Sequence, residues 1–225
     1  MKKNRSDGQE TRQKLLAAAA EIFAKKGFWE TTHVDICGKA ETNIAAVNYH
    51  FGSKETLYIE AWKYSFQKSI AKYPPDGGIS PHTSVYKRLR GRILAFMQRV
   101  ADPESNDFDI MHKEMANPTG LLDDTIEKAT DPLEEDMKSI FQELLGDKVS
   151  EKQIRFCRMS VMGQCFGPML HLRHSRSNPP VEGPRKMPLD FRIEELAEHI
   201  ISFSLAGMKS IRKDAEKTKK KSHKE

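Results

Sequence analysis

Residues 31–58 read TTHVDICGKAETNIAAVNYHFGSKETLY, and this stretch gives the most specific structural signal in the chain. Thr31, Thr32 and Asn43 are residue types that cap the N-termini of helices, and a short run of helix-compatible residues follows Thr31-Thr32 and another follows Asn43. We therefore expect two short helices, over about 32–39 and 43–51, with a tight turn between them. Two short helices in this order are the central elements of a helix-turn-helix motif.

The residues on either side of this stretch also predict helices. Apolar residues repeat at helical spacing before it, and Gly27, which follows two lysines, suits the end of that first helix. After it, Gly52 and Ser53 break the second short helix and let a longer one begin. No sustained alternation of apolar and polar residues predicts a strand. We expect an all-α fold of about nine helices, the other seven over 11–26, 53–72, 85–101, 107–117, 121–146, 150–174 and 191–213.

The clearest boundary between modules is Tyr73–Ser84, which holds three prolines and two glycines in twelve residues. Charge changes at the same place, because residues 1–72 carry 12 Lys and Arg against 8 Asp and Glu, whereas residues 73–208 carry 17 against 21. We expect domains over 1–72 and 73–213 and a basic flexible tail over 214–225. A basic end on an acidic body favours polyanion binding, with ordinary charge scatter as the alternative.

Composition excludes several classes of protein. Hydrophobic residues make up 38% and charged residues 31% of the chain, as in globular domains. The longest apolar run, Leu15–Ala20, is far shorter than the roughly 18 residues that a membrane span needs. Cys37, Cys157 and Cys165 form no CxxC pair, so neither a disulfide scaffold nor a zinc knuckle is expected. We expect a cytoplasmic protein without a membrane partner.

Motifs for catalysis and for cofactors are missing from the sequence. It has no glycine-rich phosphate loop, no GxSxG elbow and no HExxH, so we expect neither an enzyme nor a bound cofactor. His171 and His174 have the i, i+3 spacing of metal ligands, but no third ligand stands at a fitting distance along the chain. We expect no metal site, and whether these histidines or the cysteines sense anything stays open.

The second short helix carries residues that suit the reading of a DNA groove. It carries four polar or aromatic residues that can form hydrogen bonds, Asn43, Asn48, Tyr49 and His50. The small side chain of Ala45 would let the backbone approach DNA closely. At the start of the next helix, backbone amides favour phosphate anions. A plain pair of packed helices without DNA binding is the alternative.

The sequence NIAAVNYHFGSKETLY, residues 43–58, resembles the DNA-binding domain of TetR-family regulators, and it is most similar to the CecR-like branch of that family. Glu114, Asn117-Pro118-Thr119 and Pro132-Leu133 resemble landmarks of the C-terminal domain of that branch. The chain departs from the family pattern at three positions. Glu41 stands at the turn where glycine is usual, His33 replaces threonine or serine, and Asn48 replaces a frequent tyrosine. A non-glycine residue at a left-handed turn position carries some strain.

The resemblance implies particular DNA contacts. The residues that would hold phosphates are Thr32, His33, Tyr49, His50 and Lys54. The residues that would face base edges are Asn43, Ile44, Ala45 and Asn48. An N-terminal arm with Lys2, Lys3 and Arg5 would enter the adjacent minor groove, with a solvated N-terminus as the equal alternative.

The body is expected to dimerise and to bind an effector. The last two predicted helices carry small and apolar residues that would form a dimer interface, or else an intrachain core: Gly163, Gly167, Leu196, Ile200, Ser204 and Met208. Methionine and aromatic residues at helical spacing would line an effector pocket, or else form plain core: Phe108, Met111, His112, Met115, Met162, Phe166 and Met169.

These observations lead to a functional hypothesis. We expect a homodimeric repressor that binds double-stranded DNA at a palindromic operator and is released by an unknown small-molecule effector. A constitutive, sequence-tolerant DNA-binding protein without an effector is the alternative, and an enzyme without recognisable motifs is a more distant one.

Overall fold

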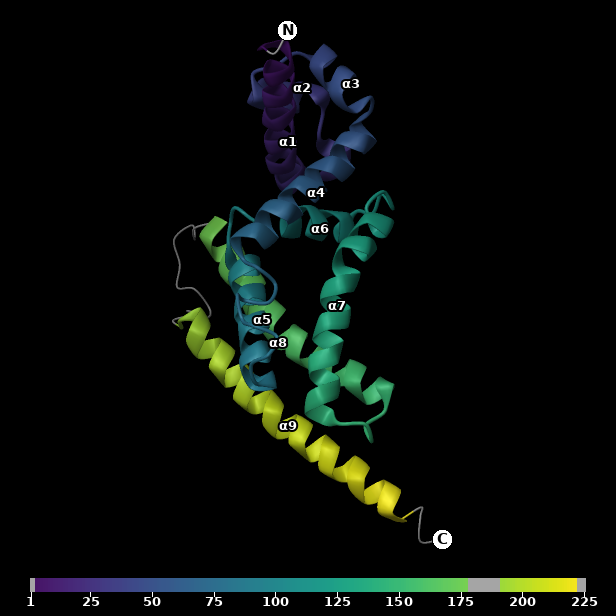
Figure 1. Ribbon diagram of the computed structural model, residues 1–225. Coiled ribbons are helices and arrows are strands. Elements are labelled where there is room, and N and C mark those ends of the chain that lie inside the picture. The colour runs from purple at the N-terminus through teal and green to yellow at the C-terminus, as the bar shows by residue number, and fades with distance from the viewer. Residues whose placement is uncertain (1–2, 178–190, 222–225) are drawn as a thin grey trace. The chain divides into compact units, whose positions relative to one another are not determined.

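The computed structural model describes residues 3–177 and 191–221, with the side chains of 7–173 and 191–217. Within these residues it has nine α-helices and no strand, which confirms the all-α fold (Figure 1). The helices are α1 (Lys3–Glu30), α2 (His33–Ala40), α3 (Ile44–Phe51), α4 (Lys54–Lys72), α5 (Val85–Ala101), α6 (Asn106–Ala116), α7 (Asp123–Leu145), α8 (Glu151–Ser177) and α9 (Ile193–Lys221).

The first and last helices are longer than their sequence patterns predict. α1 begins at Lys3 instead of residue 11, and α9 continues to Lys221 instead of ending at 213. The predicted flexible tail is therefore helical from 214 to 221, and 222–225 lie outside the described residues. Gly27 interrupts α1 with φ 78° and ψ 179°, a backbone conformation that residues with a side chain rarely adopt. The chain then makes one further helical turn, which ends at Glu30.

The chain divides into two compact units whose bounds differ from the predicted domains. The first unit holds residues 1–72 together with 104–129, and the second holds 73–103 together with 130–225. The segment 104–129, which the sequence assigned to the C-terminal domain, therefore packs with the helix-turn-helix. α7 contributes to both units because the boundary falls between Ala129 and Thr130.

The core of the first unit forms where α1 packs against α2, α3, α4 and α6. Leu15, Ala19 and Phe23 lie on the inward stripe of α1 and are fully buried. The Phe23 ring meets the Tyr58 ring of α4 edge-on, with ring centroids 4.7 Å apart. Each fully buried large apolar side chain of this kind contributes about 1.5–3 kcal/mol to folding, so this core fixes the platform on which α2 and α3 sit.

A buried carboxylate attaches α6 to α4 within the first unit. Glu114 of α6 is 6% exposed, and its Oε2 accepts a hydrogen bond of 2.9 Å from the Tyr58 hydroxyl. Its Oε1 accepts bonds from the Thr119 amide at 2.7 Å, the Thr119 hydroxyl at 2.8 Å and the Gly120 amide at 2.9 Å. Burial and the bond to Glu114 raise the pKa of Tyr58. The Glu114 and Asn-Pro-Thr landmark is thus the structural anchor of segment 104–129.

The second unit consists of α5, α8 and α9 packed together, with the greater part of α7. Leu89 and Met97 of α5 are fully buried, as are Cys165 and Met169 of α8. The buried Arg173 guanidinium at the end of α8 donates to backbone oxygens where α5 ends, at Val100, Asp102 and Pro103. This satisfies carbonyl groups that a helix C-terminus leaves without partners.

Candidate nucleic-acid interface

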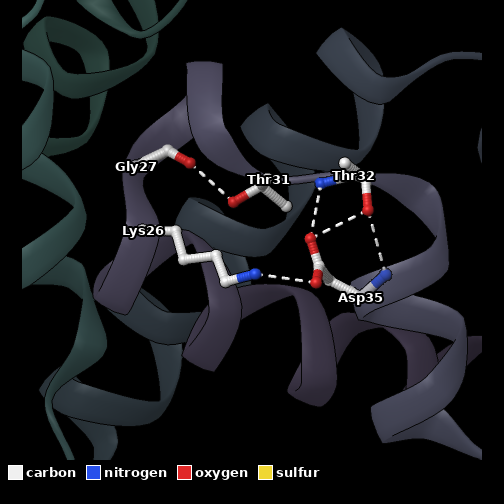
Figure 2. Close-up of polar contacts among 5 residues, drawn as sticks. All are labelled: Lys26, Gly27, Thr31, Thr32 and Asp35. Carbon is white, nitrogen blue, oxygen red and sulfur yellow. Dashed lines mark hydrogen bonds and ion pairs between the residues drawn. The ribbon is translucent and has the colours of Figure 1, made fainter.

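The orientation of α2 is set by a cap that reaches back to α1 (Figure 2). The Asp35 amide donates to the Thr32 hydroxyl at 3.2 Å, and Asp35 Oδ2 accepts from the Thr32 amide at 2.9 Å and hydroxyl at 2.8 Å. Lys26 Nζ of α1 lies 2.7 Å from Asp35 Oδ1. The Lys26 ammonium, with help from Thr32, lowers the pKa of Asp35 to about 2. Thr31 is buried and donates instead to the Gly27 carbonyl at 2.6 Å. The cap therefore confirms Thr32 as the start of the first short helix.

The turn between the two short helices is held by backbone bonds and by a second cap. Glu41 has φ 54° and ψ 42°, the left-handed conformation predicted for this position, and among the described residues it alone combines a side chain with a positive φ. The Thr42 amide donates to the Cys37 carbonyl at 3.0 Å. Asn43 then caps α3, because its Oδ1 accepts from the Ala46 amide at 3.0 Å.

The helix α3 has an inner and an outer face. Val47 is fully buried and Phe51 is 6% exposed, so both anchor α3 to the core of the first unit. On the outer side Tyr49 is 84% exposed and Ile44 is 46% exposed. All four residues predicted to face base edges are exposed: Asn43, Ile44, Ala45 and Asn48. These four residues lie on the first two turns of α3, on the side opposite the buried Val47 and Phe51.

Lys54, His50 and His33, which lie beside this face, are more buried than Tyr49. The Lys54 ammonium lies over the Phe28 ring, 4.3 Å from its centroid, and burial lowers the pKa of Lys54. His50 is half-buried and its ring meets that of Tyr49 with centroids 4.9 Å apart. His33 is half-buried, and its enclosed Nε2 has no hydrogen-bond partner in the described structure.

Two exposed apolar residues near the motif were not predicted as contacts. Trp29, at the end of α1, is 60% exposed, and Val34 of α2 is 68% exposed. The Trp29 ring is braced edge-on by Phe28, with centroids 5.3 Å apart. The break at Gly27 changes the direction of the chain before Trp29, so helical spacing along α1 does not show that Trp29 points outward. Lys2 and the side chains of Lys3 and Arg5, the predicted arm, lie outside the described residues.

Comparison with known proteins assigns the family. The sequence profile of bacterial regulatory proteins of the tetR family matches residues 15–61. The profile of the C-terminal domain of the HTH-type transcriptional dual regulator CecR matches residues 85–208, which is more than half of the chain. The chain belongs to the TetR family. It is a DNA-binding transcription regulator and not an enzyme, as the sequence predicts.

Curated relatives agree with the TetR assignment. The HTH-type transcriptional regulator SrpR of Pseudomonas putida is 26% identical over 131 residues, covering 58% of this chain and 59% of SrpR. The dual regulator CecR of Shigella flexneri is 44% identical over 52 residues, covering 23% of each chain. The matched segments thus span less than two thirds of these two relatives.

The fold of TetR regulators is also found among solved structures. A TetR-like transcriptional regulator from Rhodococcus sp. RHA1 has a TM-score of 0.64 at 18% identity, covering 88% of this chain and 95% of that one. At this level of identity the likeness shows the fold alone.

The predicted effector-pocket residues of this TetR chain are divided between the two units. Four lie on α6 in the first unit and three on α8 in the second: Phe108, Met111, His112 and Met115, then Met162, Phe166 and Met169. Met115 is 72% exposed and Met169 is fully buried. Of the seven, Met162 alone lines a cavity of about 60 Å³ in the second unit, with Tyr73, Arg92, Phe96, Arg99 and Asp136 among its other walls.

The predicted dimer residues are likewise divided, here between outward and inward positions. Gly163 and Gly167 of α8 are exposed, with open space where a Cβ would stand, and Leu196 is half-buried. Ile200, Ser204 and Met208 of α9 are buried in their own unit, where α9 packs on α5 and α8. The large apolar residues that do face outward are Phe156 and Met159 of α8 and Phe203 of α9, which are 52%, 61% and 65% exposed.

The histidines, the cysteines and the apolar helices were considered above as possible metal ligands, redox sensors and membrane spans. The described residues contain no group of three or more His, Cys, Asp or Glu that could hold a metal ion, and the side chain of His174 lies outside them. Burial raises the pKa of the Cys157 thiol and raises that of Cys165 to about 12, which disfavours the reactive thiolate. No helix in the described part of the chain is long and apolar enough to cross a membrane.

Proposed function

We propose that this TetR-family regulator is a homodimeric repressor that binds a palindromic operator through α3 of each protomer and leaves it when a small molecule binds the second unit. The observation that carries the proposal is the outer face of α3, where Asn43, Asn48 and Tyr49 are exposed while Val47 and Phe51 anchor the opposite side of the helix in the core. Its target is chromosomal DNA, so it acts in the cytoplasm.

The caps distinguish the roles of the two asparagines. Oδ1 of Asn43 is engaged by the Ala46 amide, so only its Nδ2 is available to a base acceptor. Asn48 is exposed in the body of α3 and is the residue that can pair bidentately with adenine. Ile44 and Ala45 beside it would contact thymine methyl groups. Thr32, His33, Tyr49, His50 and Lys54 would hold phosphates, and Lys54 would do so from its place over Phe28.

A second copy of the chain is the partner that best fits the outer face of α8 and α9. Phe156, Met159 and Phe203 expose large apolar surface there, which a soluble protein normally covers. A groove of about 240 Å³ between these helices is lined by Phe156, Ser160, Phe203 and Gly207 among others. The exposed glycines permit close approach of a neighbouring helix. A twofold dimer would then present two α3 helices to half-sites about 34 Å apart or a multiple of it.

The deciding experiment is selection from a random double-stranded DNA pool with the full chain. We expect enrichment of one palindrome with two half-sites. Asn48→Ala should relax the preference at one base pair per half-site, a loss of about 1–3 kcal/mol of discrimination. Tyr49→Ala should weaken binding to all sequences alike, because phosphate contacts carry no sequence information.

Tyr86→Ala is the matched control, since Tyr86 is an exposed tyrosine of the second unit and should leave selection unchanged. Recovery of no palindrome, with affinity falling equally steeply with salt on every sequence, would replace the proposal with a sequence-tolerant DNA-binding protein.

A further inference from the structure

Two arginines are buried beside the cavity of the second unit. Arg92 and Arg99 of α5 both line it and are only 9% and 8% exposed. Removing a guanidinium from water is costly unless an anion and hydrogen bonds replace the lost hydration. Asp136 is the one carboxylate among the ten residues that line the cavity, and it is the partner of Arg92. The Arg92 guanidinium therefore favours negative charge at this cavity.

The carboxylate that balances Arg92 is not itself fixed in the interior. Arg92 Nε donates to Asp136 Oδ2 at 2.5 Å, and Nη2 contacts the same oxygen. Arg92 Nη1 is buried and has no hydrogen-bond partner in the described structure. The side chain of Asp136 is 46% exposed, so it stands where the cavity meets solvent and can turn into water. Arg92 thus has one exchangeable carboxylate partner and one unused donor.

The other walls and the size of the cavity restrict what a competing anion can be. Ala95, Phe96, Met137 and Met162 make much of the lining apolar. The volume of about 60 Å³ is less than half of the roughly 150 Å³ cavity that admits benzene in another protein. A short aliphatic chain enters this space if its charged group stays at the mouth of the cavity beside the half-exposed Asp136, whereas a large aromatic drug does not fit. Apolar walls also disfavour an inorganic anion, which would lose its hydration without gaining apolar contact.

We propose that this cavity binds a small organic carboxylate. Its carboxylate takes the place of Asp136 on the Arg92 guanidinium and also uses Nη1, and its short apolar chain lies against Phe96 and Met162. This inference rests on the proposed effector role of the second unit and names the chemical class of that effector.

Binding of such an anion changes a contact between two helices. Asp136 lies on α7 and Arg92 on α5, so the ligand breaks one of the ion pairs that join these helices and leaves the Arg88–Glu143 pair. Residues 123–129 of the same α7 belong to the first unit. The ligand therefore acts on the helix that the two units share, and its effect is limited to its differential affinity for the two arrangements.

The test measures binding to the full chain in the absence of DNA. Isothermal titration and thermal unfolding are run with sodium butanoate, butanamide and butylammonium chloride, which share a shape and differ in charge. Sodium chloride and sodium phosphate at equal ionic strength control for a site that accepts any anion. We expect butanoate alone to bind saturably and to raise the unfolding temperature.

Variants separate the two charged partners. Asp136→Asn removes the competing carboxylate and should tighten butanoate binding about tenfold or more, because Arg92 then offers its charge without an internal rival. Arg92→Met should abolish binding. The matched controls are Glu135→Gln, next to Asp136 on the exposed side of α7, and Arg90→Gln, a half-exposed arginine of α5 that pairs with Glu198. Neither should change butanoate affinity.

Equal binding of butanamide, equal binding of phosphate, or absence of butanoate binding in both the natural chain and Asp136→Asn would each overturn the inference. If Arg92→Met does not fold, the expected tighter binding of butanoate to Asp136→Asn still tests the proposal. Operator affinity is measured separately. Charge-selective butanoate binding that leaves operator affinity unchanged would support the carboxylate site and contradict the proposed release from DNA.

Discussion

Each of the two units buries a charged side chain, and the two charges are held very differently. Glu114 in the first unit accepts four hydrogen bonds, from a tyrosine hydroxyl, a threonine hydroxyl and two backbone amides. Arg92 in the second unit has one carboxylate partner, on a half-exposed residue, and one buried nitrogen without a hydrogen bond. Both side chains are more than nine-tenths buried.

This difference matches what each unit has to do. A buried charge with a full set of partners holds one conformation, because any movement leaves donors unsatisfied. A buried charge with an exchangeable partner permits a second arrangement, in which another anion takes the place of that partner. The first unit must present α3 in one orientation, whereas the second must respond to a ligand. We therefore expect replacement of Glu114 to lower the stability of the first unit. Replacement of Arg92 or of its partner Asp136 should instead change the affinity of the second unit for an organic carboxylate.

The largest expected effect is on the first unit. Glu114→Ala leaves the buried Tyr58 hydroxyl without its acceptor, which costs about 1–3 kcal/mol, and it also removes the acceptor of the less buried amides of Thr119 and Gly120. We expect a decrease of about 2 kcal/mol or more in the free energy of unfolding, measured by urea denaturation. The matched control is Glu104→Ala, since Glu104 is an exposed carboxylate that pairs with Lys72 in the same unit. It should change stability by less than about 0.5 kcal/mol. A loss below about 1 kcal/mol for Glu114→Ala would remove the distinction between the two buried charges.

Much of the helix-turn-helix could be predicted because its signals are local. Thr32, Asn43 and Ser53 cap the helices that follow them, and each cap depends on residues only three positions away. The left-handed turn at Glu41, where φ is 54°, was expected from the resemblance to the TetR family and not from a local pattern. Short-range hydrogen bonds of this kind are encoded in consecutive residues, so a sequence pattern is enough to find them.

The unit boundaries and the inward or outward direction of the α9 stripe could not be predicted, because both depend on distant contacts. Segment 104–129 joins the first unit through Glu114 and Tyr58, which are 56 positions apart. A stripe of apolar residues on α9 says that one face is covered, but not whether the same chain or a second copy covers it. α5 and α8 of the same chain cover Ile200 and Met208, and Phe203 faces outward.

A smaller effect, on assembly instead of folding, is expected for the outer face of the second unit. Phe203→Ser removes an exposed aromatic from the proposed dimer interface, where a central aromatic residue contributes about 2 kcal/mol or more. We expect the dimer dissociation constant, measured by analytical ultracentrifugation, to rise about 30-fold, with the fold of each protomer retained. Tyr86→Ser removes an exposed aromatic from α5 and should leave the dissociation constant unchanged. Equal self-association of all three proteins would place the dimer contact elsewhere.

The smallest effect concerns pH, and it tests whether the first unit is held by charge at its surface as well as in its interior. The Lys26 ammonium and Thr32 lower the pKa of Asp35 from 3.8 to about 2 in the folded chain. A carboxyl group with a lowered folded pKa stabilises the folded state above its unfolded pKa, and this contribution is lost as the pH falls through the folded pKa. The stability difference between the natural chain and Asp35→Asn should therefore be constant above about pH 5. It should shrink between about pH 4 and pH 2, as urea midpoints at several pH values would show. Because both proteins share every other carboxylate, their difference isolates Asp35. A difference that does not depend on pH would mean that the neutral cap geometry, and not the Lys26 ion pair, holds α2 to α1.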